Sequence, residues 1–444
     1  MVDSPLWLHQ LSAIEKAKSL NEMALFFQVG TGKTRTTIEI LRHNYNKHKK
    51  ILRTFVICPK SVMGNWKNEI FKFSKIPAAH VFLLEGTLDK RISLLSKCPE
   101  NSIFIMNYES FAFDKFVKAT LMNPPNILIL DESHRVKGIQ AKRTKNLIKL
   151  SQSMKAKADL AHEPIYRYIL TGTPVLQNMM DLFSQFQILD CGNTLGSNYF
   201  AYRATYFYDK NAFMSKQKHF PNWQPKPNSE EKLKDLIASK VVLANKDECL
   251  DLPPLVKTEL EVELSPEQKR HYLEMKKEFI TFCESGVVTA QLAITKALRM
   301  QQILSGYLQL ESGDIVKIEE NHRASALEEL LEDITPTEKV IIWSIFHYDY
   351  EMIKGICKKL NLKYAEVTGL VKDKQKELDS FEKDPEVRVM IASPKAGGVG
   401  VNMIEASTMI YYSRSYSLED DIQSEARCYR GGSEKHKKIT RIDL

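Results

Sequence analysis

The sequence predicts an α/β fold with two parallel-sheet units and a helical insertion between or upon them. Apolar, β-rich runs alternate with helix-like segments in two blocks, at residues 23–170 and 340–442. Between these blocks we find no strand pattern before Lys339. The 444 residues also exceed a single core, because domains of about 150 residues are usual.

The first block predicts five strands, at residues 23–27, 54–58, 103–106, 127–130 and 168–170. A glycine-containing turn follows the first run and leads into apolar residues at helical spacing. Each later run ends in a polar cluster, and ligands of a parallel sheet bind at the carboxyl ends of its strands. The four clusters are Pro59-Lys60-Ser61, Asn107-Tyr108-Glu109, Asp131-Glu132-Ser133-His134 and Thr171-Gly172-Thr173-Pro174.

The central stretch, residues 190–325, differs in sequence pattern from the two strand–helix blocks. Residues 221–227 are predicted to be an irregular loop, and Leu252-Pro253-Pro254 a hinge, because proline stiffens the chain and stops a helix. Ser265-Pro266 predicts the start of a long polar helix, with proline at its first position. Strand–helix alternation then resumes, with predicted strands at residues 340–344, 364–368, 387–392, 409–412 and 439–442.

We therefore predict three parts: a first lobe at residues 1–190, helical insertions at residues 191–325 with a linker near residues 243–254, and a second lobe at residues 326–444. The composition, 43% hydrophobic and 27% charged, is that of an ordinary soluble globular protein. We find no apolar run that would cross a bilayer and no leader-like N-terminus. An intracellular protein is expected, in the cytoplasm or a host cell, with the nucleus left open.

Cysteine spacing and net charge add two weaker expectations. The seven cysteines are scattered without a Cys-x-x-Cys pair, so they predict neither a zinc site nor a disulfide framework. The formal charge of +8 fits a nucleic-acid partner without requiring one.

Residues 28–34 carry most of the pattern of a phosphate-binding P-loop. Its glycines let the backbone curl, so that N–H groups face an anion. Lys33 is expected to bind the β- and γ-phosphates of ATP, and the Thr34 hydroxyl to ligate Mg²⁺. Phe27 stands where the first glycine is usual, so the pattern is incomplete. Other residues of the sequence must decide whether this segment is a P-loop. The predicted phosphate-binding residues are Gly30, Thr31, Gly32, Lys33 and Thr34.

Asp131 and Glu132 close an apolar strand downstream of this loop. Phosphoryl transfer needs such a pair, in which one carboxylate holds Mg²⁺ and its neighbour orients or deprotonates the attacking water. An Asp-Glu pair after a strand can instead cap the next helix. The P-loop in the same predicted sheet favours the catalytic interpretation.

Two sequence features of the second block could also contact phosphate. Arg427 and Arg430 are three residues apart, so on a helix they would share a face and could supply an arginine finger to a γ-phosphate. A solvated basic helix is the alternative. Residues 393–400 form a glycine-rich strand end, for which a phosphate contact and an ordinary turn are both open.

The order of these motifs resembles the Swi/Snf-type family within helicase superfamily two, the ATP-driven translocases on double-stranded DNA. The resemblance covers nearly the whole chain and implies two RecA-like lobes, with the central insertion gripping the duplex or pushing on it. Thr171-Gly172-Thr173-Pro174 is the more specific match, since RNA helicases of the superfamily usually carry Ser-Ala-Thr there. Other matching segments are His9-Gln10, residues 30–34, residues 58–61 with Asn65-Trp66, residues 131–137 with Lys142-Arg143-Thr144, Gln177-Asn178, residues 252–254, and residues 393–400 with Asn402.

The resemblance implies roles for individual residues. Catalysis is assigned to Glu132, Gln423, Arg427 and Arg430. ATP would be bound by Gln10, Gly30, Thr31, Gly32, Lys33, Thr34 and Gly398, with Mg²⁺ held by Thr34 and Asp131. Nucleic acid would be contacted by Lys60, Ser61, Asn107, Tyr108, Lys137, Thr171, Thr173, Ser393 and Lys395.

The chain also departs from the family pattern. Phe27 and Gln28 replace an acidic pair, Tyr416-Ser417 stands where Trp-Asn is typical, and Ser433 replaces a glutamine. The chain stops at Leu444, before the family's C-terminal brace helix, and no chromatin-reading module flanks the motor. We therefore expect a minimal motor of viral or prokaryotic type that works as a monomer on double-stranded DNA.

Three other functions share the ATP-binding residues. A strand-separating helicase on RNA or on DNA forks is opposed by the motif at residue 171, the glycine-rich strand end and the central insertion. A nucleotide-gated clamp or restriction subunit is opposed by the intact Glu132 and both arginines. A small-molecule kinase would leave the second α/β unit without a purpose.

Overall fold

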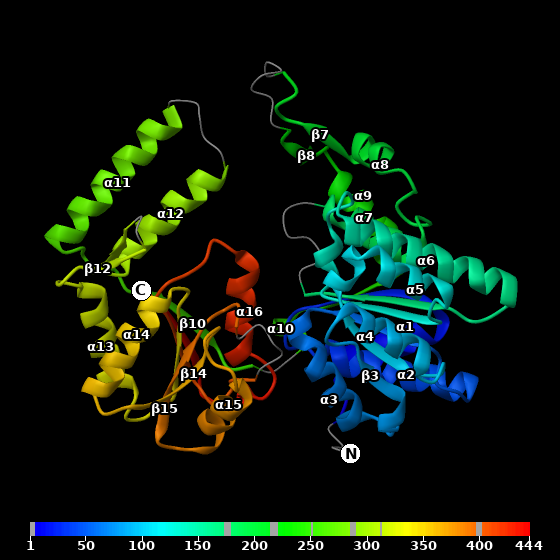
Figure 1. Ribbon diagram of the computed structural model, residues 1–444, viewed down its shortest axis with the longest axis horizontal. Coiled ribbons are helices and arrows are strands. Elements are labelled where there is room, and N and C mark those ends of the chain that lie inside the picture. Colours follow the sequence, from blue (N-terminus) through cyan, green and yellow to red (C-terminus); the bar gives the residue numbers. More distant parts are fainter. Residues whose placement is uncertain are drawn as a thin grey trace. The chain divides into compact units, whose positions relative to one another are not determined.

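The computed structural model describes residues 5–172, 179–213, 221–249, 252–284, 290–310, 313–396 and 402–444. The chain forms two compact units, Met1–Leu250 and Asp251–Leu444 (Figure 1). The segment predicted as insertions is therefore shared, with residues 191–250 in the first unit and residues 251–325 in the second. None of the helices within the described ranges is long and apolar enough to cross a membrane.

The first unit is built on a parallel sheet with the strand order β3-β4-β2-β5-β6-β1-β9. All five strands predicted here are confirmed. The edge strands β3 and β9 were not predicted, because each is very short, and Leu243 of β9 is 68% exposed. The strands are β1 (Glu22–Phe27), β2 (Thr54–Cys58), β3 (Val81–Leu83), β4 (Ile103–Asn107), β5 (Ile127–Asp131), β6 (Tyr166–Leu170) and β9 (Val241–Ala244).

Helices cover both faces of this sheet (Figure 1). Alternate residues of β1 face opposite cores: Leu25 packs with α1, α2 and α3, whereas Phe26 packs with α4, α5, α6 and α7. Burial on both faces explains why the strands are continuous apolar runs. The helices are α1 (Leu8–Ser19), α2 (Lys33–His48), α3 (Met63–Phe73), α4 (Leu88–Lys97), α5 (Asp114–Met122), α6 (Lys142–Ala161) and α7 (Asp181–Asp190).

The rest of the first unit follows α7. Helix α8 (Tyr199–Tyr206) leads into an antiparallel ribbon of β7 (Phe207–Asp209) and β8 (Trp223–Pro225), followed by α9 (Ser229–Ala238) and, after β9, α10 (Lys246–Cys249). The predicted loop at residues 221–227 thus contains a strand. The Arg203 guanidinium lies 4.1 Å from the Trp223 ring centre and fastens this strand to α8.

The second unit contains a six-stranded parallel sheet with the order β10-β17-β16-β13-β15-β14. All five strands predicted in this block are confirmed. Helices α13 and α14 share one core with the sheet, and α15 and α16 share the other. The elements are β10 (Leu255–Glu259), α13 (His322–Ile334), β13 (Val340–Trp343), α14 (His347–Lys359), β14 (Lys363–Val367), α15 (Lys374–Lys383), β15 (Val387–Ala392), β16 (Thr408–Tyr411), α16 (Leu418–Cys428) and β17 (Ile439–Asp443).

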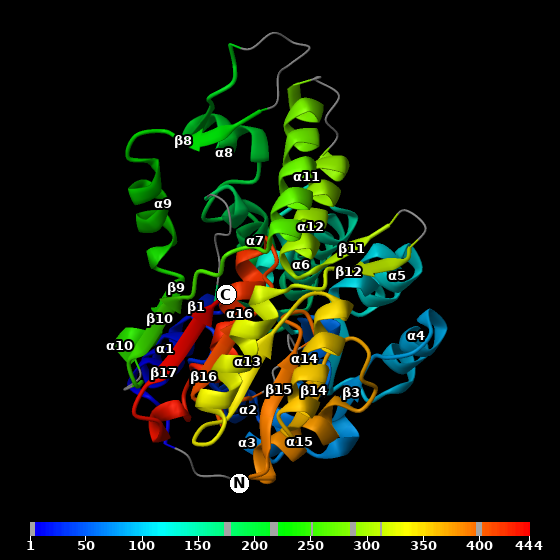
Figure 2. The same cartoon turned by 90° about the vertical axis from the view of Figure 1, so that its left-hand side faces the viewer.

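Helices α11 (Pro266–Glu284) and α12 (Ala290–Leu304) form a pair that projects from this unit (Figure 2). The predicted helix start is confirmed: the Gln268 backbone N–H donates to Ser265 Oγ, and the Ser265 N–H donates to Gln268 Oε1. A hairpin of β11 (Tyr307–Gln309) and β12 (Ile315–Lys317) follows. The expectation of no strand between residues 190 and 339 is wrong, because six short and mostly exposed strands, β7 to β12, lie there.

A buried carboxyl group lies where β13 and β16 end. Asp349 of α14 has no exposed surface, and its Oδ2 accepts hydrogen bonds from Ser344 and Ser413, both at 2.6 Å. Burial raises the pKa of Asp349 to about 6, against the lowering effect of the two hydroxyl donors. The folded protein therefore disfavours the ionised form. The stability that protonation confers is complete below about pH 4 and is lost as the pH rises through 6.

Asp349→Asn is expected to remove the loss of stability that ionisation of Asp349 causes above pH 6. At pH 8 the free energy of unfolding should rise by about 2 kcal/mol over that of the wild type, and the difference should shrink towards pH 5. Thermal unfolding of the full chain at both pH values measures the effect. Asp379→Asn, which changes an exposed aspartate of the same unit, should bring no gain. A lower melting temperature of Asp349→Asn at pH 8 would show that the fold needs the charged carboxylate.

Candidate nucleotide-binding and catalytic site

The P-loop connects the end of β1 to the start of α2. Gly30 and Gly32 have φ values of 92° and 83°, in the left-handed region that favours glycine. A Cβ atom on Gly32 would also lie 2.2 Å from Gln10 Nε2, so the end of the Gln10 side chain would have to shift. The buried Thr31 closes the turn, since its backbone N–H and its hydroxyl both donate to the Gln28 carbonyl.

Lys33 is the first residue of α2, and its Nζ donates to the Phe27 carbonyl at 3.0 Å. Phe27, which replaces the usual first glycine, thus holds the Lys33 ammonium over the loop with its backbone carbonyl. Thr34 follows in the first helical turn and is half-buried. The N-terminus of a long helix and the N–H groups of the loop together form a site for an anion.

Gln10 of α1 lies against this loop. Its Nε2 donates to the Gly32 carbonyl at 3.3 Å, and its Oε1 accepts the Trp7 N–H at 2.9 Å. The neighbouring His9 places Nε2 2.8 Å from the Thr31 carbonyl and stacks on the Trp7 ring. Both residues therefore couple α1 to the loop that would hold the phosphates.

Asp131 is the last residue of β5 and is buried. Its Oδ2 accepts a 2.8 Å hydrogen bond from Trp66 Nε1, and its Oδ1 accepts the Glu132 N–H at 3.1 Å. Burial and the Glu132 charge raise the pKa of Asp131 to about 6, whereas the Lys33 ammonium acts in the opposite direction. Trp66 was noted only as part of the Asn65-Trp66 motif, and its hydrogen bond to Asp131 was not predicted.

Glu132 has φ 55° and ψ 54°, a left-handed conformation that is uncommon for a residue other than glycine. Such backbone strain concentrates at functional sites. Its carboxylate lies 3.4 Å from His134 Nδ1, which also lies 3.0 Å from Thr171 Oγ1 at the end of β6. Glu132 makes no side-chain capping hydrogen bond to the short helix that follows, so the capping alternative does not explain this pair.

The donors gathered at this edge suit Mg²⁺ in type. Asp131 offers a carboxylate and Thr34 a hydroxyl, both hard oxygen ligands, and Mg²⁺ is commonly bound by one or two protein oxygens plus substrate phosphates. Within the described ranges, no cluster of three or more His, Cys, Asp or Glu side chains could hold a metal ion by itself.

The predicted nucleic-acid contacts of the first unit separate into two groups. Lys60 and Ser61 are exposed in a short helix directly after β2, and Lys137 is half-exposed. Tyr108 and Thr171, in contrast, are fully buried. The Tyr108 hydroxyl donates to the Asp131 carbonyl at 2.7 Å, and Thr171 bonds to His134. The two side chains brace this strand edge from within, so in this structure neither is exposed for the expected nucleic-acid contact.

Asn107 is also nearly buried. Its amide oxygen accepts from Arg91 and Ser110, and its Nδ2 donates to Glu109 at 2.8 Å. In the second unit Ser393 is 9% exposed and Lys395 is exposed. The predicted residues Thr173 and Gly398 lie outside the described residues.

The predicted arginine pair is corrected in one respect. Helix α16 ends at Cys428, so Arg430 lies beyond it and does not share a helical face with Arg427. Arg427 is buried, which excludes the solvated basic helix for this residue, and Arg430 is half-buried. Gln423 donates to Glu419 at 3.0 Å within the helix.

Arg441 of β17 positions this helix and was not predicted. Its guanidinium bonds to Glu425 at 2.8 Å and to Asp421 at 3.1 Å, both on α16, and lies 4.1 Å from the Tyr411 ring centre. The arginine is 3% exposed. The sequence signal that could have identified Arg441 is an arginine at an inward-facing position of an otherwise apolar strand.

Two protein families match the chain in succession. The SNF2-related domain matches residues 9–313, and the helicase conserved C-terminal domain matches residues 322–432. The first of these matches spans more than half of the sequence.

Individual relatives are more distant. An uncharacterized ATP-dependent helicase of Mycoplasma genitalium is 25% identical over 423 residues, which are 94% of this chain and 37% of that protein. Putative protein p41 of Acyrthosiphon pisum secondary endosymbiont phage 1 is 24% identical over 396 residues, 88% of this chain and 81% of that protein. The chain thus spans little more than a third of the Mycoplasma helicase.

Among solved structures, the SWI2/SNF2 ATPase core of Sulfolobus solfataricus in complex with dsDNA has a TM-score of 0.47 and 21% identity to this chain. The comparison covers 99% of this chain and 88% of the Sulfolobus chain. The two consecutive family matches, in the order SNF2-related domain and helicase C-terminal domain, therefore establish that the chain belongs to the SNF2-related family.

Proposed function

We propose that this chain is an ATP-hydrolysing motor that translocates on double-stranded DNA and remodels DNA or protein–DNA complexes without needing to separate the strands. One observation carries the ATPase part: the P-loop Lys33, the buried Asp131 and the strained Glu132 all belong to the carboxyl-terminal edge of one sheet. The choice of duplex DNA is supported by the family resemblance of the motifs.

In this proposal the first unit binds ATP. The loop N–H groups and Lys33 hold the phosphates, and Gln10 and His9 keep α1 against the loop on the nucleotide side. Asp131 and Thr34 would hold Mg²⁺, which supplies charge neutralisation on the β- and γ-phosphates. Binding the ion favours the carboxylate form of Asp131 and so opposes the effect of burial on its pKa.

Glu132 accepts the proton of the attacking water. Its left-handed backbone directs the side chain, and His134 beside it ties that side chain to Thr171 at the next strand end. Movement of the Thr171 strand end is therefore transmitted to the catalytic carboxylate through a single imidazole. We assign Arg427 and Arg430 to stabilising the charge on the transferred phosphoryl group, with Gln423 as their neighbour.

The proposed DNA track is built mainly from exposed residues. Lys60, Ser61 and Lys395 are exposed and keep this assignment, together with the half-exposed Lys137 and the nearly buried Ser393. Contacts to phosphates carry little sequence information, so binding should tolerate any sequence and weaken steeply as salt rises. Changes at the catalytic edge during hydrolysis would shift these contacts along the strand.

Steady-state ATP hydrolysis with duplex DNA, single-stranded DNA, RNA and no nucleic acid tests this function. Stimulation by duplex DNA alone is expected, together with displacement of a third strand from a triplex and no separation of the duplex. Stimulation by single strands or RNA only would favour a strand-separating helicase, and hydrolysis that no nucleic acid stimulates would favour a nucleotide-gated clamp.

Glu132→Gln should reduce kcat for ATP hydrolysis by about 10²–10⁴-fold while ATP still binds, because the change removes the base and keeps the shape. Lys33→Ala should lose ATP binding as well. Fluorescent-nucleotide titration and phosphate release measure the two effects separately. Glu85→Gln, at an exposed position after the edge strand β3, serves as the control. Full turnover in Glu132→Gln would refute the catalytic assignment.

Trp66→Phe should raise the Mg²⁺ concentration needed for half-maximal hydrolysis by about tenfold. The change removes the indole donor that stabilises the Asp131 carboxylate, and a hydrogen bond to a charged group is worth roughly 1.5–3 kcal/mol. Trp343→Phe is a matched control, because Trp343 is also fully buried and its Nε1 has no hydrogen-bond partner among the described residues. An unchanged Mg²⁺ requirement in Trp66→Phe would place the ion away from Asp131.

A further inference from the structure

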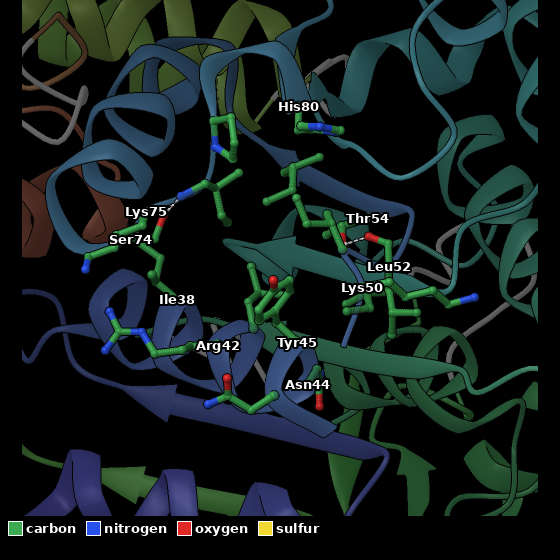
Figure 3. Close-up of a pocket in the computed structure, with 17 residues that line it drawn as sticks. Ile38, Arg42, Asn44, Tyr45, Lys50, Leu52, Thr54, Ser74, Lys75 and His80 are labelled. Atoms are coloured by element: carbon green, nitrogen blue, oxygen red, sulfur yellow. Dashed lines mark hydrogen bonds between the residues drawn. The ribbon is translucent and has the colours of Figure 1, made fainter. Parts of the chain in front are cut away.

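A pocket of about 630 Å³ lies in the first unit, away from the residues assigned to ATP (Figure 3). Thr54, Ile103 and Ile127, at the starts of β2, β4 and β5, line it. The pocket is therefore at the amino ends of the parallel strands, whereas the P-loop and Asp131 are at their carboxyl ends. Its volume lies within the range of about 300–1,000 Å³ that is usual for small-molecule sites.

The inner wall of the pocket is apolar. Ile38 and Leu41 of α2, Leu52 before β2, and the two strand isoleucines are all buried. Tyr45 projects between the opposite sides of the cavity in Figure 3 and is 49% exposed. Such a wall favours an occupant with an apolar body, because contact with it removes apolar surface from water.

Asn44 lies behind this apolar wall. It is 1% exposed, and its Nδ2 donates to the Tyr168 hydroxyl at 3.3 Å. Its Oδ1 has no hydrogen-bond partner among the described residues and almost no accessible surface, so an occupant of the pocket does not reach it. The inner wall therefore recognises an occupant through apolar contact.

The opening of the pocket is positively charged. Lys50 and Lys75 lie on opposite sides of it (Figure 3), and within the described residues neither forms an ion pair. Arg42 also lines the opening, and it shares the Glu39 carboxylate with Arg35. None of the described lining residues is acidic. An anionic group at the opening would therefore meet complementary charge.

The pocket and the nucleotide site share α2 but do not overlap. Lys33 begins this helix, and Arg42 follows nine positions later, which corresponds to about 14 Å along the helix axis at roughly 1.5 Å per residue. An occupant of the pocket would contact the second half of α2, while the phosphates of ATP would contact its first turn. The two ligands should bind without competing.

We propose that this pocket is a second ligand site, for a small amphipathic carboxylate with an apolar body. The body contacts the apolar wall, and the carboxylate meets Lys50 or Lys75. This site does not depend on the motor function, because it uses none of the residues assigned to ATP or DNA.

Calorimetric titration of the full chain with three matched probes tests the proposal. Decanoate should bind saturably at one site and most tightly. 1-Decanol, which lacks the charge, and butyrate, which lacks most of the apolar body, should each bind about fivefold more weakly or worse. Equal binding of the three probes, or no saturable binding, would overturn the proposal. So would displacement of decanoate by ATP, since that would place it in the nucleotide site.

Paired charge variants test the location. Lys50→Gln with Lys75→Gln should weaken decanoate binding by about fivefold or more and leave 1-decanol binding unchanged. The control, Lys47→Gln with Lys72→Gln, makes the same charge change in the last turns of α2 and α3, close in sequence to Lys50 and Lys75, at positions that do not line the pocket. Tyr45→Glu should abolish carboxylate binding by repulsion, whereas Tyr45→Gln should retain most of it. Equal losses in the two lysine pairs would show that only net charge matters.

Discussion

The first unit depends on one desolvated carboxylate. Asp131 ends the strand β5, where the surrounding apolar core would favour its neutral form. The Trp66 indole, the Glu132 N–H and the Lys33 ammonium favour the charged form instead. These groups come from α3, from the strand end and from the P-loop helix, so a shift of any of them changes the charge balance at Asp131. The ionisation of Asp131 is therefore set by burial on one side and by these three local partners on the other.

Buried arginines fasten helices and strands that carry proposed functional residues in both units. Arg441 joins β17 to α16 through Glu425 and Asp421, and Arg167 joins β6 to β1 through Glu22. A buried guanidinium is costly unless its donors are satisfied by well-placed carboxylates. Both arginines lie on strands and use carboxylates of neighbouring elements, so each fixes the position of a segment that carries proposed functional residues. Their contribution is better understood as positioning than as added stability.

The two edges of the first sheet differ in chemistry. At the carboxyl ends the loops carry charged and polar side chains that hold one another, as His134 does between Glu132 and Thr171. At the amino ends the apolar strand starts meet the second half of α2 and leave a cavity with a basic opening. A parallel sheet directs helix N-termini and strand ends to the first edge, which is why phosphate chemistry is expected there. The second edge has no such bias, and its cavity results from how the helices pack.

Sequence reasoning succeeded where the signal was local. Buried parallel strands are continuous apolar runs, so all ten predicted strands are present, and the glycines and Lys33 of the P-loop are identifiable from spacing. It failed where partners were distant: the short edge strands β3, β9 and β10 are held by neighbouring strands and not by their own pattern. The end of α16 at Cys428 separates Arg430 from Arg427, and burial turns Tyr108 and Thr171 inward.

The sequence by itself determined the two parallel sheets and the residue types at their functional edges, because both follow from periodicity. Only the tertiary structure decided that Trp66 bonds to Asp131, that Arg441 holds α16 and that α2 borders a second cavity, because those contacts join residues far apart in the chain.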